Sequence, residues 1–114
     1  MEFTTSLKKN FDFRKVYNRG TPIANRNLIV YILKNNMECN YLGISVSKKV
    51  GNSVIRSKVT RLIRESYRLS EKKICRGYNI VVIARNTAKG LPFFEINNSL
   101  LHLLRKHKLL NVSK

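Results

Sequence analysis

The residues of this sequence that could do chemistry are mostly cations, and they gather between positions 48 and 68. Two lysines precede a turn, and Arg outnumbers Lys in the stretch that follows. Guanidinium groups contact phosphates in a bidentate manner and stack on bases, so this composition suits a polyanion. The seven cations are Lys48, Lys49, Arg56, Lys58, Arg61, Arg64 and Arg68. Glu65 is the only acid among them, which favours a polyanion-binding surface over an ordinary solvated helix face.

Groups that could catalyse a reaction by themselves are scarce. The six Asp and Glu residues are spread along the chain without a paired-carboxylate pattern. Cys39 and Cys75 have no neighbouring His to activate a thiolate or complete a zinc site. His102 and His107 are five positions apart, which does not place both on one face of a helix. The sequence therefore predicts no catalytic residue, no metal ligand and two free thiols.

Composition limits the kind of partner. The chain has 114 residues with 23 Lys and Arg against 6 Asp and Glu, a net charge of +17. Hydrophobic residues make up 43%, enough for the core of one folded domain, predicted over residues 1–114. So large an excess of charge repels itself unless an anionic partner relieves it, and nucleic acid, an anionic membrane or an acidic protein would serve. No apolar run suggests a signal peptide or a membrane span, so we expect a cytoplasmic protein without membrane contact.

The element that must position the cations is a helix that begins after Asn52 or Ser53. Either side chain can cap its first turn, and no Gly or Pro follows until Gly77. Helical periodicity places Arg61, Arg64 and Arg68 opposite an apolar face. That face is predicted to consist of Ile55, Val59, Leu62, Ile63, Ser66 and Leu69.

A shorter helix is predicted over residues 11–19, closed by Gly20 in a left-handed conformation. Phe13, Val16 and Tyr17 form a stripe on it, and this pattern has two interpretations. Helical spacing alone favours a core stripe. Aromatics beside Arg14 and other cations are also what a single-stranded nucleic acid needs for stacking and charge neutralisation.

The remaining elements are predicted from alternation and apolar runs. Strands are expected over residues 27–33, 41–47 and 78–84, the first two joined through a hairpin and the last buried on both faces. Tyr31 is expected to be partly open on the first of them. Residues 1–10 are polar and expected to be loosely held. A final helix begins near Pro92, with its core side formed by Phe94, Leu100, Leu101, Leu103 and Leu104.

The segment SVSKKVGNSVIRSKVTRLIRESYRL closely resembles the signature of the protein subunit of bacterial ribonuclease P, which removes 5′ leaders from precursor tRNA. DFRKVYNRGTPIANRNLIVYIL and NIVVIAR resemble further parts of that family. The resemblance implies an α+β fold in the order α-β-β-β-α-β-α, like a domain of a small-subunit ribosomal protein. It also implies a four-stranded mixed sheet, with the extra strand near residues 21–27, and an unusual left-handed βαβ crossover through the basic helix.

The same resemblance implies a division of labour in tRNA processing. The RNA subunit and its Mg²⁺ ions would carry out the endonuclease chemistry, while this ribonucleoprotein subunit holds no metal itself. Its partners would be the ribonuclease P RNA and the precursor-tRNA 5′ leader, with no obligate protein partner. The leader would contact Phe13, Tyr17, Tyr31, Arg56 and Ser57, and RNA would contact the seven cations named above.

Two positions depart from the family pattern, and two rival functions stay open. Ser57 stands where the family has Asn, and Thr60 where a Lys is common, which removes an amide and about one phosphate contact. A general RNA-binding or ribosomal protein would have similar charge and aromatics. A basic membrane-surface or antimicrobial protein is the other rival, although the chain has no Trp for an interface.

Overall fold

The strand β5 (Tyr78–Ala84) lies at the centre of the fold because its side chains are apolar on both faces. In the computed structural model, which describes residues 1–111, it pairs antiparallel with β3 (Leu28–Lys34) and parallel with β4 (Asn40–Ser45). The sheet has the order β1-β4-β5-β3-β2. Its two outer strands are β1 (Thr4–Ser6), parallel to β4, and β2 (Thr21–Ala24), antiparallel to β3.

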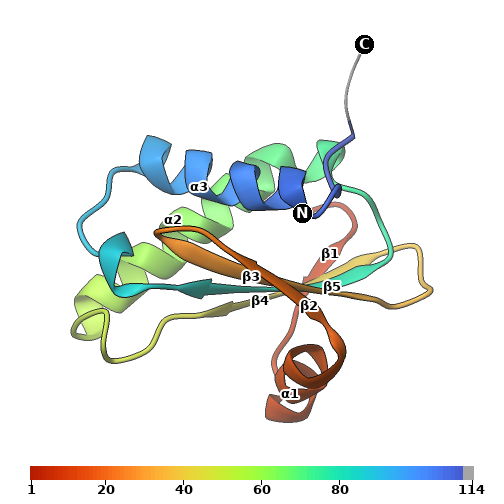
Figure 1. The fold of residues 1–114 in the computed structure, drawn as a ribbon, viewed down its shortest axis with the longest axis horizontal. Coiled ribbons are helices and arrows are strands. Elements are labelled where there is room, and N and C mark those ends of the chain that lie inside the picture. The colour runs from red at the N-terminus through yellow and green to blue at the C-terminus, as the bar shows by residue number, and fades with distance from the viewer. Residues whose placement is uncertain (112–114) are drawn as a thin grey trace.

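Three helices cover the sheet unequally (Figure 1). The helices α2 (Ser53–Ser70) and α3 (Phe93–Lys106) pack on one side, while α1 (Asn10–Arg19) lies alone on the other. We call the side under α2 and α3 the closed face and the side toward α1 the open face. Short 3₁₀ turns follow α2 at Glu71–Lys73 and β5 at Asn86–Ala88.

The closed face carries the main core. Strand alternation sends Leu28, Val30, Ile80 and Val82 toward it, where they pack with buried residues of both helices. The open face has a much smaller buried cluster of Leu7, Val16 and Val81. Partly buried residues surround this cluster, and they are Phe13, Tyr17, Tyr31, Leu33, Tyr41 and Ile83.

The predicted α+β class is confirmed, and so is the strand expected near residues 21–27. The four-stranded sheet is a correction, because residues 4–6 add a fifth strand instead of being loosely held. The Glu71 carboxylate accepts hydrogen bonds from the N–H groups of Glu2 (2.8 Å) and Phe3 (3.2 Å), which holds this segment beside β4. Burial raises the pKa of the Glu71 carboxyl, but these bonds, one from Thr4 and the N-terminal charge outweigh it, so the pKa lies below its ordinary value.

The predicted hairpin between β3 and β4 is wrong, because β5 lies between these two strands. The chain turns instead at Asn36, which has φ of 59°, and crosses the end of β5. Asn40, fully buried at the start of β4, satisfies all its side-chain hydrogen-bonding groups there. It donates to the Tyr67 hydroxyl and the Cys75 carbonyl and accepts from the N–H groups of Gly77 and Tyr78.

One backbone expectation and two side-chain expectations are also corrected. Gly20 has φ of −83°, so it is not left-handed; a Cβ there would lie 2.5 Å from the Val16 carbonyl oxygen. Leu69 is 59% exposed and Phe94 is 63% exposed, although both were expected in the core. Tyr67 and Ile96 occupy the buried positions instead, because each helix faces the sheet over a slightly different arc than periodicity suggested. Residues 112–114 of the predicted domain lie outside the described residues.

Candidate nucleic-acid interface

The site is built over the second half of β4, where the strand has a neighbour on one side only. β1 pairs with Asn40–Leu42, whereas Gly43, Ile44 and Ser45 pair only with β5. The helix α1 flanks this half-strand on the open face, and α2 flanks it from the other side. A groove therefore lies above the β4 edge, with one helix along each wall.

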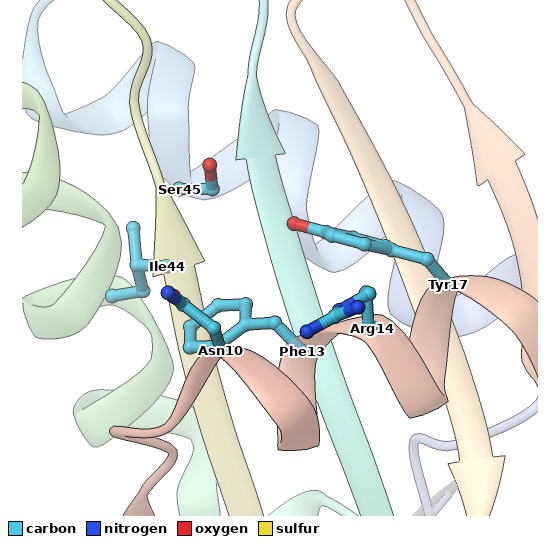
Figure 2. A pocket seen from close by; sticks show the side chains of 6 residues that line it. All are labelled: Asn10, Phe13, Arg14, Tyr17, Ile44 and Ser45. Carbon is cyan, nitrogen blue, oxygen red and sulfur yellow. The ribbon is translucent and has the colours of Figure 1, made fainter.

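The α1 wall is aromatic (Figure 2). The Phe13 ring lies across Gly43, where an added Cβ would come within 2.6 Å of two ring carbons, so the glycine makes room for the ring. Tyr17 is 6.4 Å from Phe13 and 5.1 Å from Tyr31 between ring centroids, the second pair edge to face. A hollow of about 460 Å³ opens beside these rings. Its lining residues are Asn10, Phe13, Arg14, Tyr17, Ile44 and Ser45.

The core interpretation of the aromatic stripe is confirmed for Val16, and the nucleic-acid interpretation stays a prediction. Val16 is fully buried and belongs to the core, while Phe13 and Tyr17 stay half-buried beside the hollow. Burial raises the pKa of the Tyr17 hydroxyl, opposed by a hydrogen bond with Ser45 and reinforced by the Tyr31 hydroxyl. Tyr17 is therefore a neutral side chain that offers both a ring and a hydrogen-bonding group to a ligand in the groove.

The α2 wall is cationic and polar. The Asn52 side chain caps the helix by accepting from the Ile55 N–H (3.0 Å), as predicted, and the Arg56 Nε donates to the Gly51 carbonyl at 3.2 Å. A hollow of about 450 Å³ lies against this wall. Its lining residues are Ile44, Val46, Ser53, Arg56, Ser57, Thr60 and Arg64.

Ile44 lines both hollows, so the two adjoin at the β4 edge, and we call them together the α1–α2 groove. All the predicted leader-contacting residues except Tyr31 line this groove. Tyr31 packs edge to face against Tyr17 instead. The structure thus brings together Phe13 and Tyr17 with Arg56 and Ser57, although these pairs are about 40 positions apart in the chain.

The other predicted cations lie outside the groove. Lys58 and Arg61 are exposed on α2, and Lys48 is exposed in the turn before it. Arg68 is also exposed, but its Nε donates to the Glu65 carboxylate at 3.0 Å. This bond lowers the pKa of Glu65 and raises that of Arg68. The helix therefore presents Arg56 and Arg64 in the groove, and three further exposed cations that do not line it.

One cationic hollow was missed from the sequence. It measures about 820 Å³ and lies where β5 ends, and its cations are Lys49, Arg26 and Arg85. The Arg85 guanidinium donates to the Asn25 carbonyl at 3.1 Å, and Thr87 donates to the Arg26 carbonyl at 2.6 Å, which fixes the hollow's shape. The signal in the sequence was Arg85, a cation that directly follows a buried strand and could have indicated this hollow.

Neither a metal centre nor a membrane span is found in the described part of the chain. Within residues 1–111, no three His, Cys, Asp or Glu side chains come together as a metal site requires. The groove is lined by no carboxylate, the ligand that Mg²⁺ prefers, so its donor set does not fit that ion. No helix in the same residues has the length and apolar character needed to cross a bilayer.

Comparison with known proteins identifies the family of this chain. The family model described as Ribonuclease P matches residues 1–108. The chain belongs to the ribonuclease P protein family. A ribonuclease P protein component of Alkaliphilus metalliredigens is 54% identical over 111 residues, which are 97% of this chain and all of that protein. Family membership makes the chain a protein component of ribonuclease P, an endoribonuclease that acts in tRNA 5′ processing.

Solved structures agree with this assignment. The ribonuclease P protein of Staphylococcus aureus superposes with a TM-score of 0.86 at 43% identity, over 93% of this chain and 97% of that one. The protein from Thermotoga maritima gives 0.82 at 31% identity, over 89% of this chain and 96% of that one. The resemblance stated from the sequence is thereby confirmed.

Proposed function

We propose that the α1–α2 groove binds the single-stranded 5′ leader of precursor tRNA. The observation that carries this proposal is the groove's composition, with two half-buried aromatic rings on one wall and two arginines on the other. Single strands bind through base stacking on aromatics and phosphate contacts to cations, and the groove offers both along one path. Phe13 and Tyr17 would stack on bases, while Arg56 and Arg64 would contact the backbone.

The exposed cations outside the groove suit a second role. Lys58, Arg61 and Arg68 are exposed, but none of them lines the groove. We propose that they contact the ribonuclease P RNA, as do Lys48 and Lys49, and that Arg26 and Arg85 extend this contact beside Lys49. Phosphate neutralisation by such a set lowers the repulsion between two RNAs and makes affinity steeply salt-dependent.

The chemistry of cleavage would belong to the RNA subunit. The protein groove has stacking and phosphate-binding groups but no carboxylate or histidine among its lining residues. Mg²⁺ would be held mainly by RNA phosphates, and the protein would assist by holding the leader in place. No further protein partner is needed in this scheme, and the cytoplasm is the expected compartment.

Reconstitution tests the proposal. The chain is added to a bacterial ribonuclease P RNA at low Mg²⁺, and cleavage of a 5′-labelled precursor tRNA is mapped. We expect cleavage at the mature 5′ end to be restored. A general RNA-binding protein would bind the RNA without restoring this cleavage. A membrane-surface protein would instead bind anionic liposomes in a manner that survives high salt.

A further inference from the structure

The outer face of α1 carries an exposed aromatic ring among cations. Phe11 is 69% exposed and lies beside a hollow of about 300 Å³, on the side of the helix away from the buried Val16. The hollow is lined by Phe11, Arg14, Lys15, Asn18 and Arg19. The first four of these follow helical spacing i, i+3, i+4 and i+7, so they form one continuous stripe.

Exposure of one apolar side chain needs no explanation by itself, but the surroundings of Phe11 set it apart. Phe94, on α3, is 63% exposed and serves as a comparison. Its neighbours at i+3 and i+4 are Asn97 and Asn98, whereas those of Phe11 are Arg14 and Lys15. Only the ring on α1 therefore combines a stacking surface with two adjacent cations.

The charge around α1 also favours an anionic ligand. Lys8 and Lys9 are exposed immediately before the helix, and Asp12 is the only acid within it. Cations at a helix N-terminus are unfavourable because they oppose the helix dipole. Phosphate groups close to this end would relieve that repulsion.

We propose that this outer stripe binds an unpaired nucleotide of a second RNA segment, one that belongs to the ribonuclease P RNA. The base would stack on Phe11, and its flanking phosphates would contact Arg14 and Lys15. The inference rests on the proposed function for the identity of the RNA. It goes beyond that function because it assigns α1 a second binding face.

The geometry separates this segment from the leader. Phe13 and Tyr17 point toward the sheet, whereas Phe11 and Lys15 point away from it, with the thickness of a helix, about 10 Å, between them. A strand stacked in the groove would therefore not reach Phe11 or Lys15. Arg14 lines both hollows and can contact phosphates of both RNAs. The helix would thus hold the leader against the RNA subunit.

Fluorescence of a single introduced tryptophan tests this proposal, because the chain contains none. The variants are Phe11→Trp and its matched control Phe94→Trp, each titrated with ribonuclease P RNA and, separately, with a single-stranded leader oligonucleotide. We expect the RNA subunit to quench the Phe11→Trp variant through stacking, and the oligonucleotide to leave it unchanged. The Phe94→Trp variant should respond to neither.

A filter-binding assay on the same samples separates the outcomes. Quenching of Phe11→Trp by the oligonucleotide alone, or no quenching while the RNA subunit is bound, would overturn the proposal. A change in Phe11→Trp fluorescence with vesicles of anionic phospholipid, but with neither RNA, would also overturn it. If neither RNA were retained on the filter, the proposed function itself would fail.

Truncation gives an independent measure. We expect Phe11→Ala to weaken binding of the RNA subunit roughly fivefold or more, since a stacked base contributes at least that factor. The preference for precursor over mature tRNA should stay unchanged, because the groove is intact. Phe94→Ala should leave both quantities as they are. A loss of the preference for precursor in Phe11→Ala would contradict a separate outer face.

Discussion

The two faces of the sheet use the same kinds of residue for different purposes. On the closed face, Tyr67 is fully buried and its hydroxyl bonds to Thr4 (3.0 Å) and Asn40 (3.2 Å). On the open face, Tyr17 and Tyr31 pack edge to face but stay half-buried. An aromatic ring with every edge covered contributes to stability alone, whereas a ring with a free edge can still receive a ligand.

This difference follows from how much helix covers each face. Two helices of 18 and 14 residues pack on the closed face, whereas a single helix of 10 residues packs on the open one. Mutations on the closed face should therefore change the free energy of unfolding, and mutations on the open face should change RNA affinity.

The largest effect is expected from Ile63→Ala on the closed face. Ile63 is fully buried between α2 and the sheet, and truncation of such a residue costs about 2–5 kcal/mol because a cavity remains. Urea unfolding measures this loss. Leu69→Ala on the same helix, where the side chain is largely exposed, is the control and should change the free energy of unfolding by less than about 0.5 kcal/mol. Leader affinity should be unchanged for both variants under conditions where they are folded.

On the open face, Tyr17→Ala should weaken precursor-tRNA binding by about 1–3 kcal/mol, the value of one stacked base. Binding of mature tRNA, which has no leader, should change little. Equilibrium binding of both tRNAs to the reconstituted enzyme measures the ratio. Tyr17→Phe keeps the ring and is the matched control, expected to retain most of the affinity. Equal losses of affinity for the two tRNAs would contradict binding of the leader in the groove.

Gly43→Ala should change both the free energy of unfolding and the leader affinity, because the new Cβ would lie 2.6 Å from the Phe13 ring. The ring must shift, so we expect a loss of about 1 kcal/mol in the free energy of unfolding together with weaker leader binding. Adding Phe13→Ala to Gly43→Ala should restore part of the stability but none of the affinity. Stability that stays low in the double variant would show that the strain lies in β4 itself.

Local signals were enough to locate the main elements of the closed face, though not every residue of its core. The helix α2 has a cap at Asn52 and a long apolar period, and β5 is an unbroken β-branched run, so both could be located from neighbouring residues. The strand order could not, because pairing of β3 with β5 joins residues about 50 positions apart. β1 has only the polar residues TTS, which carry no alternation, and its position depends on bonds to Glu71.

The candidate site was predictable as a set of residue types but not as a shape. Arginines on the polar side of α2 were expected to be exposed, and they are. Which of them line the groove depends on where β4 loses its neighbour, which no local pattern records. The hollow beside Arg85 joins three separate turns of the chain, so only the folded structure reveals it.

The smallest expected effect is a pH dependence confined to the closed face. His107 donates through Nε2 to the Val30 carbonyl at 2.7 Å, and burial lowers its pKa below 6.5, opposed in part by that bond. The unfolded chain therefore takes up a proton first, so stability should fall as pH drops through about 6.5. Urea unfolding between pH 7.5 and about 5.5 avoids titration of the carboxylates and measures the slope. His107→Asn should flatten it, whereas His102→Asn, at an exposed position of α3, should not. If His102→Asn removed the slope instead, the part-buried bond between His107 and β3 would not be its source.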